Sequence, residues 1–96
     1  MAIKKMLIIT AKDNVGVVLE DVLAGDLCVF EEKELVARED IPFPHKISLV
    51  DLNAEDNVIK YGEAIGHALT AIPAGSLIHS HNMGCRRGTN DEEGKV

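Results

Sequence analysis

Apolar segments in this chain are short, and turn-forming residues separate them. Leu27–Phe30 follows Gly25-Asp26, and Leu77-Ile78 follows Pro73-Ala74-Gly75. No segment approaches the ~20 apolar residues of a membrane-spanning helix. Many short segments between closely spaced Gly and Pro turns are typical of all-β folds. We therefore predict a mainly β, barrel-like domain that does not enter a membrane.

Strands are expected where β-branched and aliphatic residues alternate with polar ones. The expected strands are residues 3–10, 27–30, 34–38, 45–49, 58–62, 64–69 and 77–81. One short helix is expected near residues 14–23, because apolar residues recur there at helical spacing. Those residues are Val15, Val18, Leu19, Val22 and Leu23. Asp13-Asn14 would cap the start of this helix, and Gly25 would end it.

Size and charge restrict the classes of function. The chain has 96 residues, which is one small domain. We place this domain at residues 1–83 and expect residues 84–96 to form a flexible polar tail. The formal net charge is −6 and only 3% of residues are aromatic, which argues against nucleic acid as a partner. The apolar run near the N-terminus is too short for a signal peptide, so we expect a cytoplasmic protein.

Two segments of the sequence resemble each other. Residues 23–27 (Leu-Ala-Gly-Asp-Leu) resemble residues 72–77 (Ile-Pro-Ala-Gly-Ser-Leu), and both place a turn of small residues before an apolar strand. Chance similarity between two turns is one explanation, and a true repeat is the other.

The four residues His79-Ser80-His81-Asn82 are the main candidates for chemistry. On a strand, His79 and His81 would point to the same face, where two imidazoles can contact a divalent metal or an anionic substrate. A solvent-exposed end of a strand is the alternative. Two histidines leave a metal site incomplete, so further ligands would come from elsewhere.

His45 and Lys46 form a second candidate group, which would suit a carboxylate ligand; ordinary surface charge is the alternative interpretation. His67 lies in a strand-like segment and is expected to have a structural role. Lys60-Tyr61-Gly62 is interpreted as the end of a strand followed by a glycine turn.

Six stretches together resemble the SAF-type N-terminal domain of the altronate and galactarate dehydratase family. In chain order they are Asp13-Asn14-Val15, His45-Lys46-Ile47, Val58-Ile59-Lys60-Tyr61-Gly62, Ile65-Gly66, Ile72-Pro73-Ala74-Gly75 and His79-Ser80-His81-Asn82. The resemblance implies a small β-clip fold. It also implies a much larger domain that completes the active site of a lyase acting on sugar acids. Some members divide these parts into small and large subunits, including sulfolactate sulfo-lyase, and this chain resembles such a small subunit.

The resemblance further implies a β-elimination, in which water or sulfite leaves a hydroxy acid as a proton is lost beside its carboxylate. Dehydratases of this family depend on a divalent metal, commonly iron or manganese. On this basis we expect His79 and His81 to be catalytic and to contact the metal. His45 and Lys46 would bind the substrate carboxylate. His67 departs from the family, whose members often carry other residues at this position.

Three interpretations of function remain open. The first is the small component of a sugar-acid dehydratase, active together with a large lyase subunit on a small hydroxy acid. The second is the small subunit of a sulfolactate sulfo-lyase. The third is a non-catalytic module that binds a small acid or a partner protein. A periplasmic chaperone-like SAF domain is a further alternative, which the lack of a secretion signal disfavours. Assembly into a homo-oligomer is also left open.

Overall fold

The computed structural model describes residues 1–85, and these residues form nine strands and no helix. The strands are β1 (Ile3–Leu7), β2 (Val15–Val18), β3 (Leu27–Phe30), β4 (Lys33–Val36), β5 (Lys46–Ser48), β6 (Asn57–Lys60), β7 (Glu63–Ala68), β8 (Leu77–Ile78) and β9 (Met83–Gly84). The mainly β fold predicted from the sequence is confirmed. Because the described residues contain no helix, they contain no helix that could span a membrane.

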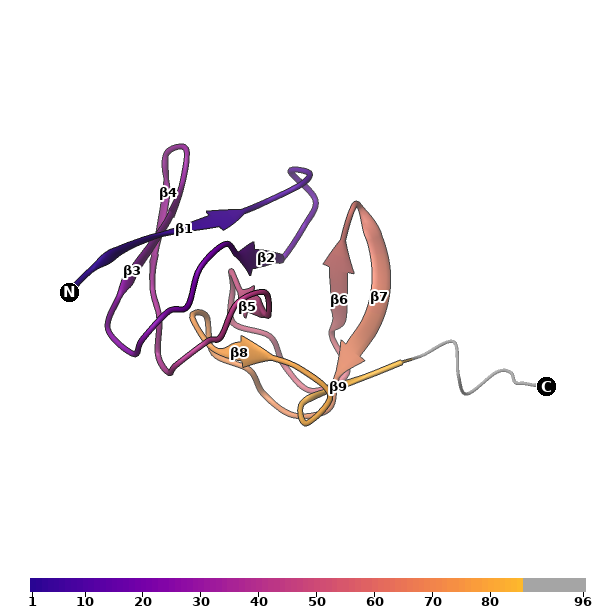
Figure 1. The fold of residues 1–96 in the computed structure, drawn as a ribbon. Coiled ribbons are helices and arrows are strands. Elements are labelled where there is room, and N and C mark those ends of the chain that lie inside the picture. The colour runs from indigo at the N-terminus through magenta and orange to yellow at the C-terminus, as the bar shows by residue number, and fades with distance from the viewer. Residues whose placement is uncertain (86–96) are drawn as a thin grey trace.

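The strands form two sheets. The larger sheet has the order β4-β3-β1-β2-β5-β8, and the smaller one has the order β6-β7-β9. Strand β1 pairs with β3 in parallel, and the other neighbouring strands are antiparallel. Figure 1 shows the β6–β7 hairpin standing beside the larger sheet.

The prediction of a helix near residues 14–23 is wrong. Residues 15–18 form β2, and Val22 forms an isolated bridge with Ile41. Valine is β-branched and favours extended backbone, while glycine weakens a helix. The apparent helical spacing arises because a strand and a separate extended segment each bury a valine. Gly25 has a φ of 91° and lies in a turn that Asp26 closes by donating its N–H to the Leu23 carbonyl.

Most of the other predicted strands occur, but their ends differ. The strand expected over residues 77–81 ends at Ile78, because residues 79–82 turn back toward β7. Strand β9 was not predicted, and its Gly84 pairs with His67 although the expected tail begins at that glycine. The remainder of the expected tail, residues 86–96, lies outside the described residues.

The structure has an internal repeat whose halves are about thirty positions apart, so it equates residues 23–27 with residues 53–57 and not with the similar turn at 72–77. Val22 and Ile41 exchange two backbone hydrogen bonds, and Leu52 and Ile72 do the same in the second half. Each bridge is followed by a four-residue turn and a hairpin: β3–β4 in the first half and β6–β7 in the second. A register irregularity in the second hairpin accommodates one additional residue. Strands β2 and β5 pair with each other and occupy equivalent places, about thirty positions apart.

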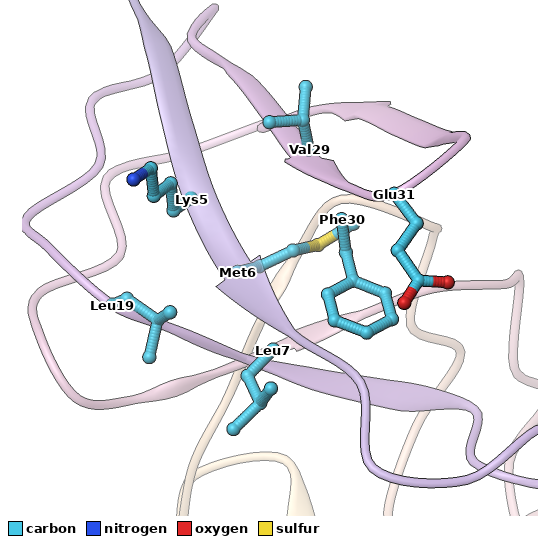
Figure 2. Close-up of a pocket in the computed structure, with 7 residues that line it drawn as sticks. All are labelled: Lys5, Met6, Leu7, Leu19, Val29, Phe30 and Glu31. Carbon is cyan, nitrogen blue, oxygen red and sulfur yellow. The ribbon is translucent and has the colours of Figure 1, made fainter.

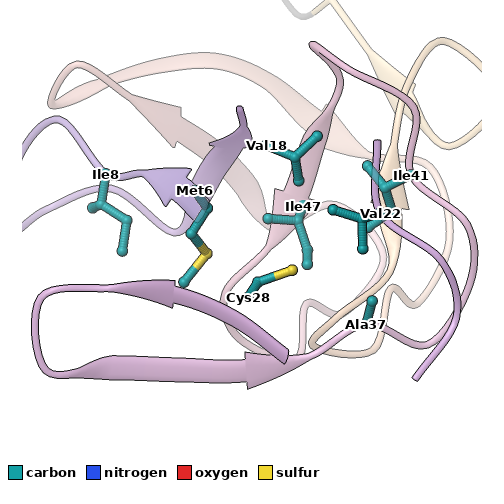
Figure 3. Close-up of a cluster of buried hydrophobic side chains, with 8 residues drawn as sticks. All are labelled: Met6, Ile8, Val18, Val22, Cys28, Ala37, Ile41 and Ile47. Atoms are coloured by element: carbon teal, nitrogen blue, oxygen red, sulfur yellow. The ribbon is translucent and has the colours of Figure 1, made fainter. Parts of the chain in front are cut away.

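Two apolar clusters match the two halves. The first cluster, drawn in Figure 3, contains Met6, Ile8, Val18, Val22, Cys28, Ala37, Ile41 and Ile47. The second contains Val15, Leu52, Val58, Ala68, Ile72 and Ile78. Strand β5 separates the two clusters, since Ile47 faces the first and the side chains of its neighbours face the second.

Candidate functional site

His45 and His79 are brought together at the end of the β5–β8 ladder. Lys46 pairs with Ile78 and Ile47 with Leu77, so His45 lies opposite His79 when this register is continued. The two imidazole rings are 4.7 Å apart and meet edge to face at 72°. His79 is exposed and His45 is half-buried. Two of the four predicted site residues therefore form one pair, although they are far apart in the sequence.

The tautomer of His45 follows from its hydrogen bond. Its Nδ1 lies 2.9 Å from the carbonyl oxygen of Pro42. A carbonyl oxygen only accepts, so Nδ1 carries the proton and donates it. In the neutral ring the Nε2 atom then carries the lone pair, and this atom can accept a proton or bind a metal.

Asn82 holds the turn that presents His79. Its Oδ1 accepts the backbone N–H of His79 at 3.0 Å, and its Nδ2 donates to the carbonyl of Leu77 at 2.8 Å. The carbonyl of His79 in turn accepts N–H groups of Asn82 and Met83. Asn82 is 7% exposed, so these contacts are shielded from water. Asn82 therefore positions His79, the first histidine of the predicted motif.

His81 does not share a face with His79 in the way a strand would require. It lies in the turn, is exposed, and has no hydrogen bond or ring contact with His45 or His79 in the described part of the chain. The expectation that His79 and His81 alternate with Ser80 along a strand is wrong. A turn forms instead, closed by Asn82, whose side chain hydrogen-bonds the backbone of Leu77 and His79 and whose N–H donates to the His79 carbonyl.

Lys46 lies on the opposite face of the larger sheet from His45. It is next to Ile47, which faces the first cluster, and its cross-strand partner Ile78 belongs to the second. Burial lowers the pKa of Lys46, and the positive charge of Lys60 lowers it further. His45 and Lys46, which were predicted to act as one group, therefore lie on two different faces of the sheet.

Comparison with known proteins identifies the family. The family described as the altronate/galactarate dehydratase SAF domain matches residues 4–86, which is most of the chain. This chain belongs to that family. The SAF domain is 42% identical over 74 residues to altronate dehydratase of Escherichia coli, covering 77% of this chain and 15% of that enzyme.

Two shorter relatives are sulfo-lyase subunits. The (2R)-sulfolactate sulfo-lyase subunit alpha of Paracoccus pantotrophus is 43% identical over 53 residues, which is 79% of its length. That of Chromohalobacter salexigens is 34% identical over 84 residues, which is 89% of its length. The SAF domain thus spans about a sixth of the dehydratase relatives and most of the sulfo-lyase alpha subunits.

The donor atoms of this SAF domain suit only part of a metal site. Within residues 1–85, no group of three or more His, Cys, Asp or Glu side chains is arranged to hold a metal ion. The His45–His79 pair offers imidazole nitrogen, which suits iron. A divalent metal bound by these two imidazoles would need further ligands from outside the pair.

The apolar pocket in Figure 2 lies away from these residues. It has a volume of about 310 Å³ and is lined mainly by β1 and β3, with Leu7, Leu19 and Phe30 among its walls. None of the four predicted site residues contributes to it. His67 also lies apart from the pair, in β7, where its ring packs against Gly84 and its buried Nδ1 has no hydrogen-bond partner among residues 1–85.

Lys60 is the neighbour of the site that sequence reasoning missed. Its ammonium lies 4.8 Å from the centre of the Tyr61 ring. The available signal was a lysine directly before an aromatic residue within a stretch that carries the family resemblance. That signal did not connect Lys60 with Lys46, because the two lysines lie on strands of different sheets.

Proposed function

We propose that this SAF domain is the small component of a lyase that eliminates water from a sugar acid, in concert with a large lyase chain. The proposal rests on the His45–His79 pair, which presents a free imidazole nitrogen at an open end of the sheet. The dehydratase relatives, in which this region is only about a sixth of the enzyme, support the need for further chain.

The chemistry proposed for this pair is proton transfer and binding. An imidazole can accept or donate a proton near neutral pH, as loss of a proton beside a carboxylate requires. His79 and His81 are proposed as the residues that contact a divalent metal and the reacting part of the acid. Such a metal, iron or manganese, would polarise the departing hydroxyl when bound. His45 is proposed to hold the ring of His79, and Lys46, on the opposite face of the sheet, to bind an anionic group of the ligand away from the reacting atoms.

A second candidate is the small subunit of a sulfolactate sulfo-lyase. It is favoured by the coverage of the two alpha subunits, in which this domain makes up most of a separate subunit. The elimination would be the same, with sulfite leaving in place of water. Turnover on altronate, galactarate and sulfolactate distinguishes the two candidates.

The test combines the purified chain with a large lyase chain from the same organism. We expect no turnover from the SAF domain alone, and turnover on one of the three acids from the mixture. His79→Ala should lower the rate of the mixture by ~10²–10⁴, as loss of a general acid or base does. Its effect on the melting temperature should be small, because the side chain is exposed.

Ser80→Ala is the matched control, since Ser80 is exposed in the same turn. It should leave both rate and melting temperature unchanged. Histidines that merely support the turn would give the reverse pattern for His79→Ala, with a lower melting temperature and full activity per folded molecule. That pattern would refute the proposed role.

A further inference from the structure

We propose that Lys46 and Lys60 together bind an anionic group of the ligand, at a subsite separate from the His45–His79 pair. The proposal rests on the function proposed above. It adds Lys60, to which neither the resemblance nor the relatives assign a role, and it names the ligand chemistry as a carboxylate or a sulfonate.

The two lysines approach each other from different sheets. Lys46 shares its face of β5 with the cross-strand partners Val17 and Ile78, which look toward the smaller sheet. Lys60 shares its face of β6 with Val58, which is buried in the same apolar cluster as Ile78. Both lysines are half-buried. Both lysine side chains therefore border the second apolar cluster, one from each sheet.

Neither ammonium is neutralised by the described part of the chain. Lys4 forms an ion pair with Asp26 there, whereas neither Lys46 nor Lys60 has an acidic partner. Glu63 lies opposite Lys60 across the hairpin, yet no ion pair forms, and the ammonium lies over the Tyr61 ring instead. This occurs in a chain with 16 acidic and 10 basic residues. Burial and Lys60 both lower the pKa of Lys46, as expected when two cations share a site without a counterion.

The internal repeat shows that the fold itself does not require these lysines. In the first half, the last position of the hairpin strand is Phe30, which packs against the first cluster. Gly16 occupies the position on β2 that corresponds to Lys46 on β5. Equivalent backbone thus tolerates an aromatic side chain and a glycine. The two cations in the second half are therefore better explained by a ligand than by packing.

An oxyanion group is the ligand that fits two ammonium groups. Each ammonium can donate up to three hydrogen bonds, and carboxylate or sulfonate oxygens accept them. Tyr61 keeps Lys60 in place through the cation–π contact without neutralising its charge. An uncharged polyol offers no charge to either lysine and is excluded from this subsite.

The experiment is an NMR titration of the full chain that follows the side-chain signals of Lys46 and Lys60. The probes are glycolate, a hydroxylated monocarboxylate; isethionate, a hydroxylated sulfonate of the same charge; and erythritol, which is uncharged. We expect saturable shifts of both lysines with at least one anion and none with erythritol. The anion that binds more tightly identifies the group as carboxylate or sulfonate.

Variants test the role of the second cation. Lys60→Met keeps an aliphatic side chain and should weaken anion binding by about tenfold or more, as loss of a charged hydrogen bond does. It should also raise the pKa of Lys46 toward its ordinary value, a readout that stability alone would not change. Lys60→Arg should retain binding. Lys33→Met, at an exposed lysine on β4, is the matched control and should bind like wild type.

The subsite is refuted if neither anion shifts the two lysines, or if Lys60→Met binds as tightly as Lys33→Met. The binding measurements need no large lyase chain, so their outcome is independent of the test of the proposed function. Anion binding without turnover in the mixture leaves the subsite and overturns the lyase function. Turnover of the mixture with an unchanged KM in Lys60→Met supports the lyase function and overturns the subsite.

Discussion

Asp13 links the two sheets, and its removal should cost much of the stability of the domain. Its Oδ1 accepts the Gly62 N–H at 2.9 Å and the Thr10 hydroxyl at 2.8 Å. Its Oδ2 accepts the N–H groups of Ile9 and Thr10 at 3.3 and 3.2 Å. Asp13→Asn keeps the shape but replaces one accepting oxygen with an NH₂ group that faces two donors.

The magnitude follows from those four contacts. Hydrogen bonds to a charged group contribute ~1.5–3 kcal/mol each, and the amide loses about two of them. A loss of ~3–6 kcal/mol should lower the melting temperature by roughly 12 °C or more, at ~4–8 °C per kcal/mol for a domain of this size. Asp51→Asn is the control, because this exposed carboxylate accepts a single N–H from Ala74. It should cost less than ~1 kcal/mol.

The pH dependence gives a second test of the same contact. Burial acts to raise the pKa of Asp13, but hydrogen bonds from Gly62 and Thr10 outweigh it and lower the pKa from 3.8 to about 2. The unfolded chain therefore binds more protons than the folded one in this window. The contribution of Asp13 is complete above pH 3.8 and is lost as the pH falls toward 2.

Urea unfolding of wild type and Asp13→Asn at pH 7, 5 and 3 measures this effect. We expect an equal difference in unfolding free energy at pH 7 and 5, and a smaller one at pH 3. A difference below ~0.5 kcal/mol at pH 7 is what an ordinary surface change gives, and it would refute the reasoning. A difference that does not change with pH would refute the assignment to the charge.

Two further changes probe the turn and the contact of β7 with β9. Asn82→Ala should lower the unfolding free energy by ~1–3 kcal/mol, since it leaves buried backbone groups unpaired, and thermal melts should show Ser80→Ala unchanged. Gly66→Ala should cost ~1–3 kcal/mol, because its new methyl would overlap the Gly84 carbonyl. Gly25→Ala has open space and should cost only ~1 kcal/mol for its φ of 91°; equal melts of both alanine variants would contradict this.

The sequence was sufficient for the fold class because short apolar segments and turn residues are local signals. It was misleading at residues 15–23, where two separate extended segments bury valines at intervals that imitate a helix. Local patterns do not reveal which segment a residue pairs with. The bridge from Val22 to Ile41 depends on that pairing, so the strand and the helix could not be distinguished beforehand.

The candidate site was predictable in part for the same reason. His45 and His79 could be selected as residues with suitable chemistry, but their contact depends on the register between β5 and β8. The turn at residues 79–82 depends on the buried side chain of Asn82, whose partners cannot be seen from spacing. Lys60 escaped attention because its neighbour Lys46 lies in another sheet.

The two apolar clusters also determine how the domain can open. The β6–β7 hairpin is tied to the larger sheet mainly through the second cluster and the contacts of Asp13 and Asn14. Amide hydrogens of this hairpin should therefore exchange with solvent through a partial opening that leaves β1 and β3 protected. Such an opening carries Lys60 away from Lys46. An anion bound between the two lysines should therefore slow amide exchange in the hairpin. Binding at one small site would in this way reduce the opening of the entire second sheet.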